Sequence, residues 1–135
     1  MILSKPVVAA VDFSISSFPV LRQAARIAKI EEVPLFVIHV VFPGLLPHRP
    51  GCRPLPKIID NARLLAEEKL DALIDTAELD AVAKAMVLVG RPPDELGKFV
   101  EQEDVGLLVI AANKPEQKRL SSIASRCVRT VPCDV

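Results

Sequence analysis

Short runs of apolar residues alternate along this chain with longer segments in which apolar and polar residues recur at helical spacing. The apolar runs are Val7–Val11, Leu35–Val41, Ala85–Val89 and Val105–Ala111. Each run is continuous except for His39 in the second, which is typical of parallel strands that are buried on both faces. The helical pattern covers about 14–30, 58–79, 92–100 and 117–129. The pattern therefore predicts four strands, each followed by a helix.

Strands that alternate with helices predict an α/β fold with an open parallel β-sheet, in three layers with helices on both faces, of the Rossmann-like type. A fifth strand is expected to begin near Cys133, and only its first residues fall within the sequence. We expect residues 1–135 to form one domain, because the length is enough for a single core. In such a sheet, ligands bind at the carboxyl ends of the strands.

The segment between the second strand and the second helix differs from the rest of the chain. Five prolines fall within residues 42–57, and we expect an extended excursion there rather than a helix or a strand. The helix that follows is expected to bury one face, made of Ile58, Ala62, Leu65, Ala66, Leu73 and Ala77. Serines before the first helix are candidate N-caps, at Ser14, Ser16 and Ser17.

Composition and charge narrow the possible function classes. Formal net charge is zero, so no overall basic field attracts nucleic acid or an anionic membrane. Three cysteines without a CxxC pair argue against a disulfide framework or a zinc site and fit a reducing cytosol. No signal-peptide pattern is visible and no apolar run reaches the roughly 20 residues that span a bilayer. We therefore expect a cytoplasmic protein with neither nucleic acid nor membrane as a partner.

Asp12 and Gly90 are the first candidate site residues. Asp12 follows the first predicted strand, where its carboxylate can accept hydrogen bonds from a ribose or another polar ligand. It can equally cap the following turn with Ser14, and the sequence leaves both interpretations open. Gly90 closes the third strand. A turn that needs a positive φ is the favoured interpretation, and close approach of the backbone to a ligand is the alternative.

The sequence contains no recognisable catalytic or metal-binding motif. His39 lies in an apolar strand and is expected to be a hydrogen-bonded histidine of an edge strand rather than a general base. GxSxG, the P-loop and GxGxxG motifs are all missing from the sequence, as is any metal-ligand spacing. Basic residues gather near Ser121 and Ser122, and a basic surface helix is favoured there over a phosphate site. We expect neither enzymatic activity nor a metal cofactor.

The order of elements and several local motifs resemble the universal stress protein family. The stretch from Val8 to Ser14 is similar to the family's first strand with its aspartate, and His39-Val40 to the end of its second strand. Gly90-Arg91-Pro92-Pro93 is similar to the glycine-led start of the third helix. Residues 121–124 and 131–135 resemble the last helix and the entry to the last strand. The likeness spans essentially the whole chain.

The resemblance implies nucleotide binding in one branch of the family and none in another. Binding members carry G-x2-G, then nine residues, then G-[ST]. Ala111 and Lys114 stand where the first two glycines belong, Ser121 stands for the third, and Ser122 matches the Ser/Thr. Only six residues separate Lys114 from Ser121. Without these glycines, backbone N–H groups cannot wrap a triphosphate in the family's manner.

The leading hypothesis is a non-catalytic stress-response module of the branch that does not bind ATP, without a cofactor. The resemblance implies a homodimer joined largely through the last strand, and the protein partner is unknown. One alternative is an ATP- or AMP-binding stress sensor with an altered phosphate loop. Its expected contacts are Asp12, Val40, Gly90, Ala111, Lys114, Ser121 and Ser122. Another alternative is a regulatory domain of a larger protein, which the end of the sequence at Val135 suggests.

Overall fold

Four parallel strands form the centre of the fold in the computed structural model, which describes residues 5–79 and 83–110. They are β1 (Val7–Ala10), β2 (Leu35–Val41), β3 (Ala83–Val89) and β4 (Leu107–Ile110), in the order β3-β2-β1-β4. The register places Val7 beside both Leu35 and Leu107. The strand order reverses between β1 and β4, which is the kind of switch point where α/β proteins bind ligands.

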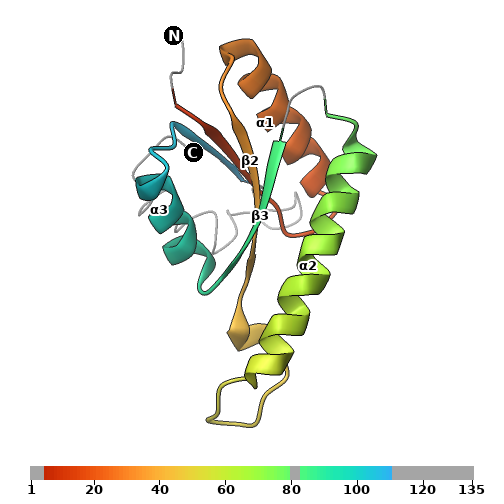
Figure 1. Cartoon of the computed structure of the whole chain (residues 1–135), viewed down its shortest axis with the longest axis vertical. Helices are drawn as coiled ribbons and strands as arrows, with labels where there is room; N and C mark the ends of the chain where they lie inside the picture. Colours follow the sequence, from red (N-terminus) through yellow and green to blue (C-terminus); the bar gives the residue numbers. More distant parts are fainter. Residues whose placement is uncertain (1–4, 80–82, 111–135) are drawn as a thin grey trace, which may run out of the picture.

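The helices lie on both faces of this sheet. They are α1 (Ser17–Glu31), α2 (Pro56–Ala77) and α3 (Pro92–Gln102). Figure 1 shows α1 and α2 on one side of the strands and α3 on the other. Successive residues of a strand point to opposite faces of the sheet. Val7 therefore packs in the cluster with α1 and α2, whereas Val8 packs in the cluster with α3. The predicted three-layer α/β fold is therefore confirmed.

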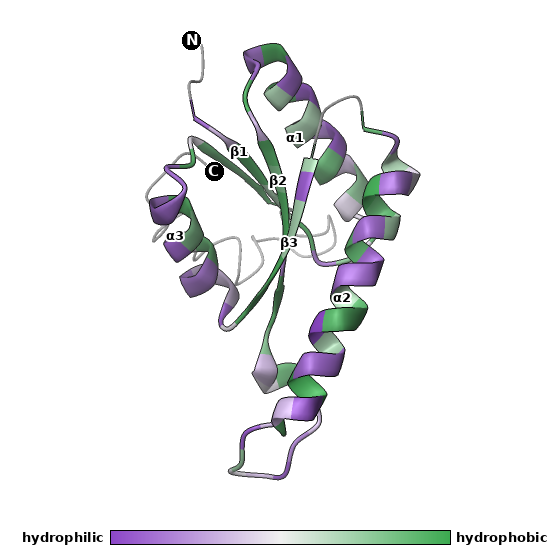
Figure 2. Cartoon of the chain, viewed as in Figure 1, coloured by the Kyte–Doolittle hydropathy of each residue, from purple (hydrophilic) through white to green (hydrophobic). Residues whose placement is uncertain are grey.

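The strands are mainly apolar, as Figure 2 shows, because both faces of the sheet are covered, and the hydrophilic section of β3 is the exposed Lys84. On the α1 side, Leu21 is fully buried among the small side chains Ala24, Ala25 and Ala28. On the α3 side, the rings of Phe36 and Phe99 meet edge to face with centroids 5.2 Å apart. The scarcity of aromatic residues therefore leaves the core to aliphatic side chains and this ring pair.

The strand boundaries differ slightly from those predicted. β2 has the predicted bounds, β1 ends one residue earlier at Ala10, and β3 begins two residues earlier at Ala83. Val105 is buried, but it lies before the start of β4. Its amide donates to the carbonyl of Val100 at 3.0 Å, so this residue belongs to the turn that ends α3 and not to the sheet. Such shifts are typical of the ends of strands, where an apolar run can continue past the last hydrogen bond between neighbouring strands.

The start of α1 has no side-chain cap at its N-cap residue, although Oγ of Ser14 accepts a hydrogen bond from the amide of Ser16 at 3.3 Å in the turn before it. Ser16 stands at the N-cap position, but its backbone is already helical and its side chain makes no capping hydrogen bond. The carbonyl of Ser14 instead accepts from the amide of Ser17 at 3.0 Å. Pro19 fits in the first turn because its missing N–H has no intrahelical partner to lose there. The prediction of a side-chain cap is therefore wrong for Ser16.

The proline-rich segment contains one short helical turn. A 3-10 helix, η1 (Pro43–Leu45), follows β2, so the prediction of a wholly extended segment is wrong at this turn. Pro56 begins α2, where a proline is tolerated at the first helical position. The inward face of α2 also differs from the prediction: it buries Ala66, Leu70 and Ala77, whereas Leu65 is 52% exposed.

Among the helices of the described residues, none is both long enough and apolar enough to cross a membrane. The predicted last helix and the predicted fifth strand lie outside the described residues.

Candidate functional site

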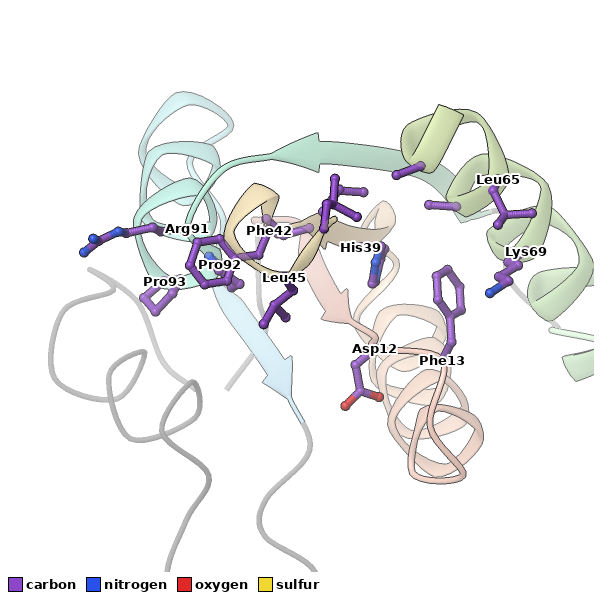
Figure 3. Close-up of a pocket in the computed structure, with 15 residues that line it drawn as sticks. Asp12, Phe13, His39, Phe42, Leu45, Leu65, Lys69, Arg91, Pro92 and Pro93 are labelled. Atoms are coloured by element: carbon purple, nitrogen blue, oxygen red, sulfur yellow. The ribbon is translucent and has the colours of Figure 1, made fainter. Parts of the chain in front are cut away.

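A cavity of about 770 Å³ opens around the carboxyl end of β2. Figure 3 shows that its walls come from the turn after β1, the end of β2, η1, one face of α2 and the start of α3. This position is the carboxyl edge of the parallel sheet, where the fold type places ligands. A cavity of this size is in the range that holds a small molecule.

Asp12 stands at the edge of this cavity, directly after β1. Its Oδ1 accepts a hydrogen bond from the amide of Ser14 at 2.9 Å and from the hydroxyl of Ser17 at 3.4 Å. The first of these bonds is the Asx-type turn that the sequence suggested, and the cavity lining includes Asp12 as well. The two interpretations of Asp12 are therefore compatible, because both of these bonds engage the single oxygen Oδ1 of a carboxylate that also lines the cavity.

The ionisation of Asp12 follows from these contacts. Partial burial by itself raises the pKa of the carboxyl, but the hydrogen bonds from Ser14 and Ser17 outweigh it, so the pKa lies below the ordinary value of 3.8. The side chain is consequently an anion near neutral pH and acts as an acceptor only.

The lowered pKa predicts how acid affects stability. Because the folded state binds the proton less readily than the unfolded state, Asp12 stabilises the fold above pH 3.8 and loses this effect as pH falls through the folded-state pKa. Urea unfolding from about pH 5 to about pH 2.5 should show a smaller loss of stability for Asp12→Asn than for the wild type. Ser17→Ala, which removes one donor, should fall between them. Equal losses in all three proteins would contradict the assignment.

Phe13 adopts a backbone conformation that is rare for a bulky residue. Its φ is 64°, in the left-handed region, which costs about 1–3 kcal/mol. The conformation turns the ring to the cavity, where it meets the imidazole of His39 with centroids 4.4 Å apart. The ammonium of Lys69 lies 5.8 Å from the centre of the Phe13 ring, within cation–π range.

A hydrogen bond fixes the imidazole of His39, against which the Phe13 ring packs. Its Nδ1–H donates to the carbonyl of Val11 at 2.8 Å, which ties the end of β2 to the end of β1. The prediction of a hydrogen-bonded histidine is therefore confirmed. Its predicted place in an edge strand is wrong, because β2 pairs with β1 on one side and β3 on the other.

The rest of the cavity is mainly apolar. From α2 it is lined by Ala62, Leu65, Ala66 and Lys69, and from the end of β2 and η1 by Val40, Val41, Phe42, Leu45 and Leu46. Arg91, Pro92 and Pro93 close it at the start of α3. Within the described residues neither Lys69 nor Arg91 forms an ion pair, whereas Arg63 on α2 pairs with Glu67 at 3.8 Å.

Gly90 shapes the turn that brings Arg91 to the cavity. Its φ is 148°, and its amide donates to the carbonyl of Val41 at 2.9 Å. A Cβ on this residue would lie 2.5 Å from Oε1 of Glu95. Both observations support the interpretation of Gly90 as a turn glycine.

The comparisons with known proteins bear on this site. The model of the universal stress protein family matches residues 4–135. The chain belongs to this family. A comparison with curated protein sequences found no match.

Solved universal stress proteins share the fold over nearly the whole chain. The protein of Archaeoglobus fulgidus is 26% identical, with a TM-score of 0.76 over 98% of this chain and 97% of that one. The structure of the A. fulgidus protein in complex with dAMP is 27% identical, with a TM-score of 0.71 over 100% and 97%. UspA of Lactobacillus plantarum is 20% identical, with a TM-score of 0.71 over 97% and 94%, and shows the fold alone.

In this universal stress protein, the structure brings together some of the residues that the sequence singled out. Asp12 and Val40 line the cavity, and Gly90 lies directly before Arg91, which lines it as well. Four predicted contacts lie outside the described residues: Ala111, Lys114, Ser121 and Ser122. Their role stays a prediction.

Several cavity residues escaped the sequence analysis, among them the ring and the two cations that are closest to a functional role. Phe13 and Arg91 stood within the family motifs without being assigned a role, and Lys69 was not considered at all. A signal for Lys69 existed, since it follows Ala62, Leu65 and Ala66 at helical spacing on the same face of α2.

Proposed function

We propose that this universal stress protein is a non-catalytic stress-response module that binds a nucleoside monophosphate and binds ATP weakly or not at all. The observation that carries the proposal is the anionic Asp12, held at the end of β1 on a cavity that Val40 also lines. A carboxylate at this edge can accept hydrogen bonds from a sugar hydroxyl. The neighbouring apolar walls provide a surface for a base.

The related A. fulgidus protein supports the choice of ligand. It was solved in complex with dAMP, it is 27% identical, and the match covers the whole of this chain. The loop sequence supports the limit on phosphates. No glycine occurs between Ala111 and Ser122, so a triphosphate would lack the close backbone N–H contacts that glycines permit.

The chemistry of the cavity supports a binding role rather than catalysis. Ser17, whose hydroxyl donates to Asp12 Oδ1 at 3.4 Å, is 2% exposed and is not offered to a substrate. The Nδ1 of His39 is occupied by the carbonyl of Val11. Within the described residues no group of acidic, histidine or cysteine side chains could hold a metal ion.

We also propose a cytoplasmic homodimer that pairs through the last strand, as the family resemblance implies.

The test is calorimetric titration with dAMP and with ATP. We expect saturable binding of dAMP and weaker binding of ATP. The variant Asp12→Asn should bind dAMP about tenfold more weakly, since it replaces a charged acceptor in a hydrogen bond. Asp104→Asn is the matched control: it alters a carboxylate that pairs with Lys5 at 3.2 Å and does not line the cavity.

Two results would count against the proposal. Failure of dAMP to bind at millimolar concentration would remove the nucleotide site. A dissociation constant for ATP in the low micromolar range, about −8 kcal/mol, would show that the glycine-free loop does not weaken triphosphate binding.

A further inference from the structure

We propose that the cavity also binds a medium-chain acyl anion, with its carboxylate at Lys69 and its aliphatic chain along α2 toward η1. This ligand class goes beyond the nucleotide proposal and depends on other residues of the cavity. Three features of the cavity support it: the face of α2 that lines the cavity, the apolar wall opposite that face, and the charged side chains at the rim.

The cavity face of α2 is an apolar stripe that ends in a cation. Ala62, Leu65, Ala66 and Lys69 follow each other at spacings of three and four residues, so they lie on one face of the helix. Lys69 lies seven positions after Ala62, which corresponds to about 10 Å along the helix axis. The stripe therefore offers a linear apolar path with one positive end.

The part of the wall opposite this stripe that the described residues make has no polar side chain. It is made by Val41 at the end of β2, by Phe42 directly after it, and by Leu45 and Leu46 of the η1 turn. Figure 3 shows Phe42 and Leu45 on one side of the cavity and Leu65 with Lys69 on the other. Two of the flanking leucines are exposed to solvent, Leu45 to 82% and Leu65 to 52%. An aliphatic chain between them would remove apolar surface from water, whereas a ribose or phosphate would find no side-chain hydrogen bond there.

The charges of the cavity favour an anion. Among the described residues that line it, Lys69 and Arg91 are the cations and Asp12 is the carboxylate, so these ionised side chains sum to one positive charge. Lys69 forms no ion pair within the described residues, and its ammonium is held over the Phe13 ring at 5.8 Å. This ammonium is therefore available to a carboxylate that enters above the apolar stripe.

The test is calorimetric titration of the full chain with decanoate, below the concentration at which it forms micelles, and with the neutral decanol. We expect saturable binding of decanoate and binding of decanol that is about tenfold weaker, because decanol lacks the charge-assisted contact with Lys69. Decanoate should also raise the apparent dissociation constant of dAMP, because both ligands occupy one cavity.

Substitutions on α2 test whether decanoate lies along the apolar stripe with its carboxylate at Lys69. Leu65→Ser should weaken decanoate binding about tenfold, since it removes apolar contact from the stripe. Leu64→Ser is the control, because Leu64 is similarly exposed at 56% on the same helix and does not line the cavity. Lys69→Met should weaken decanoate binding about tenfold but leave decanol binding unchanged, since it keeps an apolar stem and removes the charge.

Several outcomes would overturn the proposal. They are the absence of decanoate binding, equal binding of decanoate and decanol, or equal effects of Leu64→Ser and Leu65→Ser, which would indicate nonspecific adsorption to exposed leucines. A protein that binds dAMP but not decanoate would refute the acyl site and leave the nucleotide proposal standing.

Discussion

The variant Leu70→Ala is expected to have a free energy of unfolding about 2–5 kcal/mol lower than that of the wild type. Leu70 is fully buried on α2, in the cluster that α2 forms with α1, β1 and β2. Three alanines of α1 belong to the same cluster, and their short side chains cannot extend into the space that the lost leucine atoms leave. Urea unfolding followed by circular dichroism measures the loss.

The matched control is Leu64→Ala. This leucine lies on the same helix but is 56% exposed, so its replacement should change the free energy of unfolding by no more than about 0.5 kcal/mol. Similar losses for the two variants would mean that α2 does not present Leu70 to the sheet. In that case α2 would be rotated about its axis relative to the structure described here. The stripe from Ala62 to Lys69 would then not line the cavity either.

The variant Gly90→Ala is expected to lower the free energy of unfolding by about 1–3 kcal/mol. Two causes act together. A φ of 148° is a conformation that an alanine rarely adopts, and the new Cβ would lie 2.5–2.8 Å from three side-chain atoms of Glu95. Thermal or urea unfolding measures the loss of stability.

The double variant Gly90→Ala/Glu95→Ala separates these causes. Truncation of Glu95 removes the close contact but leaves the backbone conformation unchanged, so most of the loss should persist if strain dominates. Glu95→Ala alone is the reference, because it also removes the exposed ion pair with Lys98 at 3.6 Å. A Gly90→Ala protein as stable as the wild type would show that this turn adapts to a side chain.

The sheet could be predicted because its strands are covered on both faces. Continuous apolar runs such as Leu35–Val41 leave little ambiguity, and the alternation with helices then implies parallel strands. The order of the strands in the sheet, by contrast, could not be predicted from the sequence. Nothing local to His39 tells whether its strand has one neighbour or two, and so its predicted place at an edge was wrong.

The candidate site was only partly predictable for a related reason. Asp12 could be found because the end of a first strand is a fixed place in this fold type. Phe13 and Lys69 come together only because the backbone of Phe13 turns into the left-handed region, which a sequence pattern does not specify for phenylalanine. Leu65 carried the same apolar signal as Leu70, and only the packing of α2 decides which of them faces the cavity and which the core.

The central place of β1 has a consequence for how the chain is made. Val7 leaves the ribosome early, yet one of its two partners in the sheet is Leu107, one hundred positions later. Until β4 has been synthesised, one edge of β1 has unpaired amides and carbonyls in an apolar strand, which is the kind of surface that associates with other chains. The nascent protein therefore keeps this edge of β1 unpaired while the rest of the chain emerges, because β2 pairs with the opposite edge and α1 covers only a face of the strand.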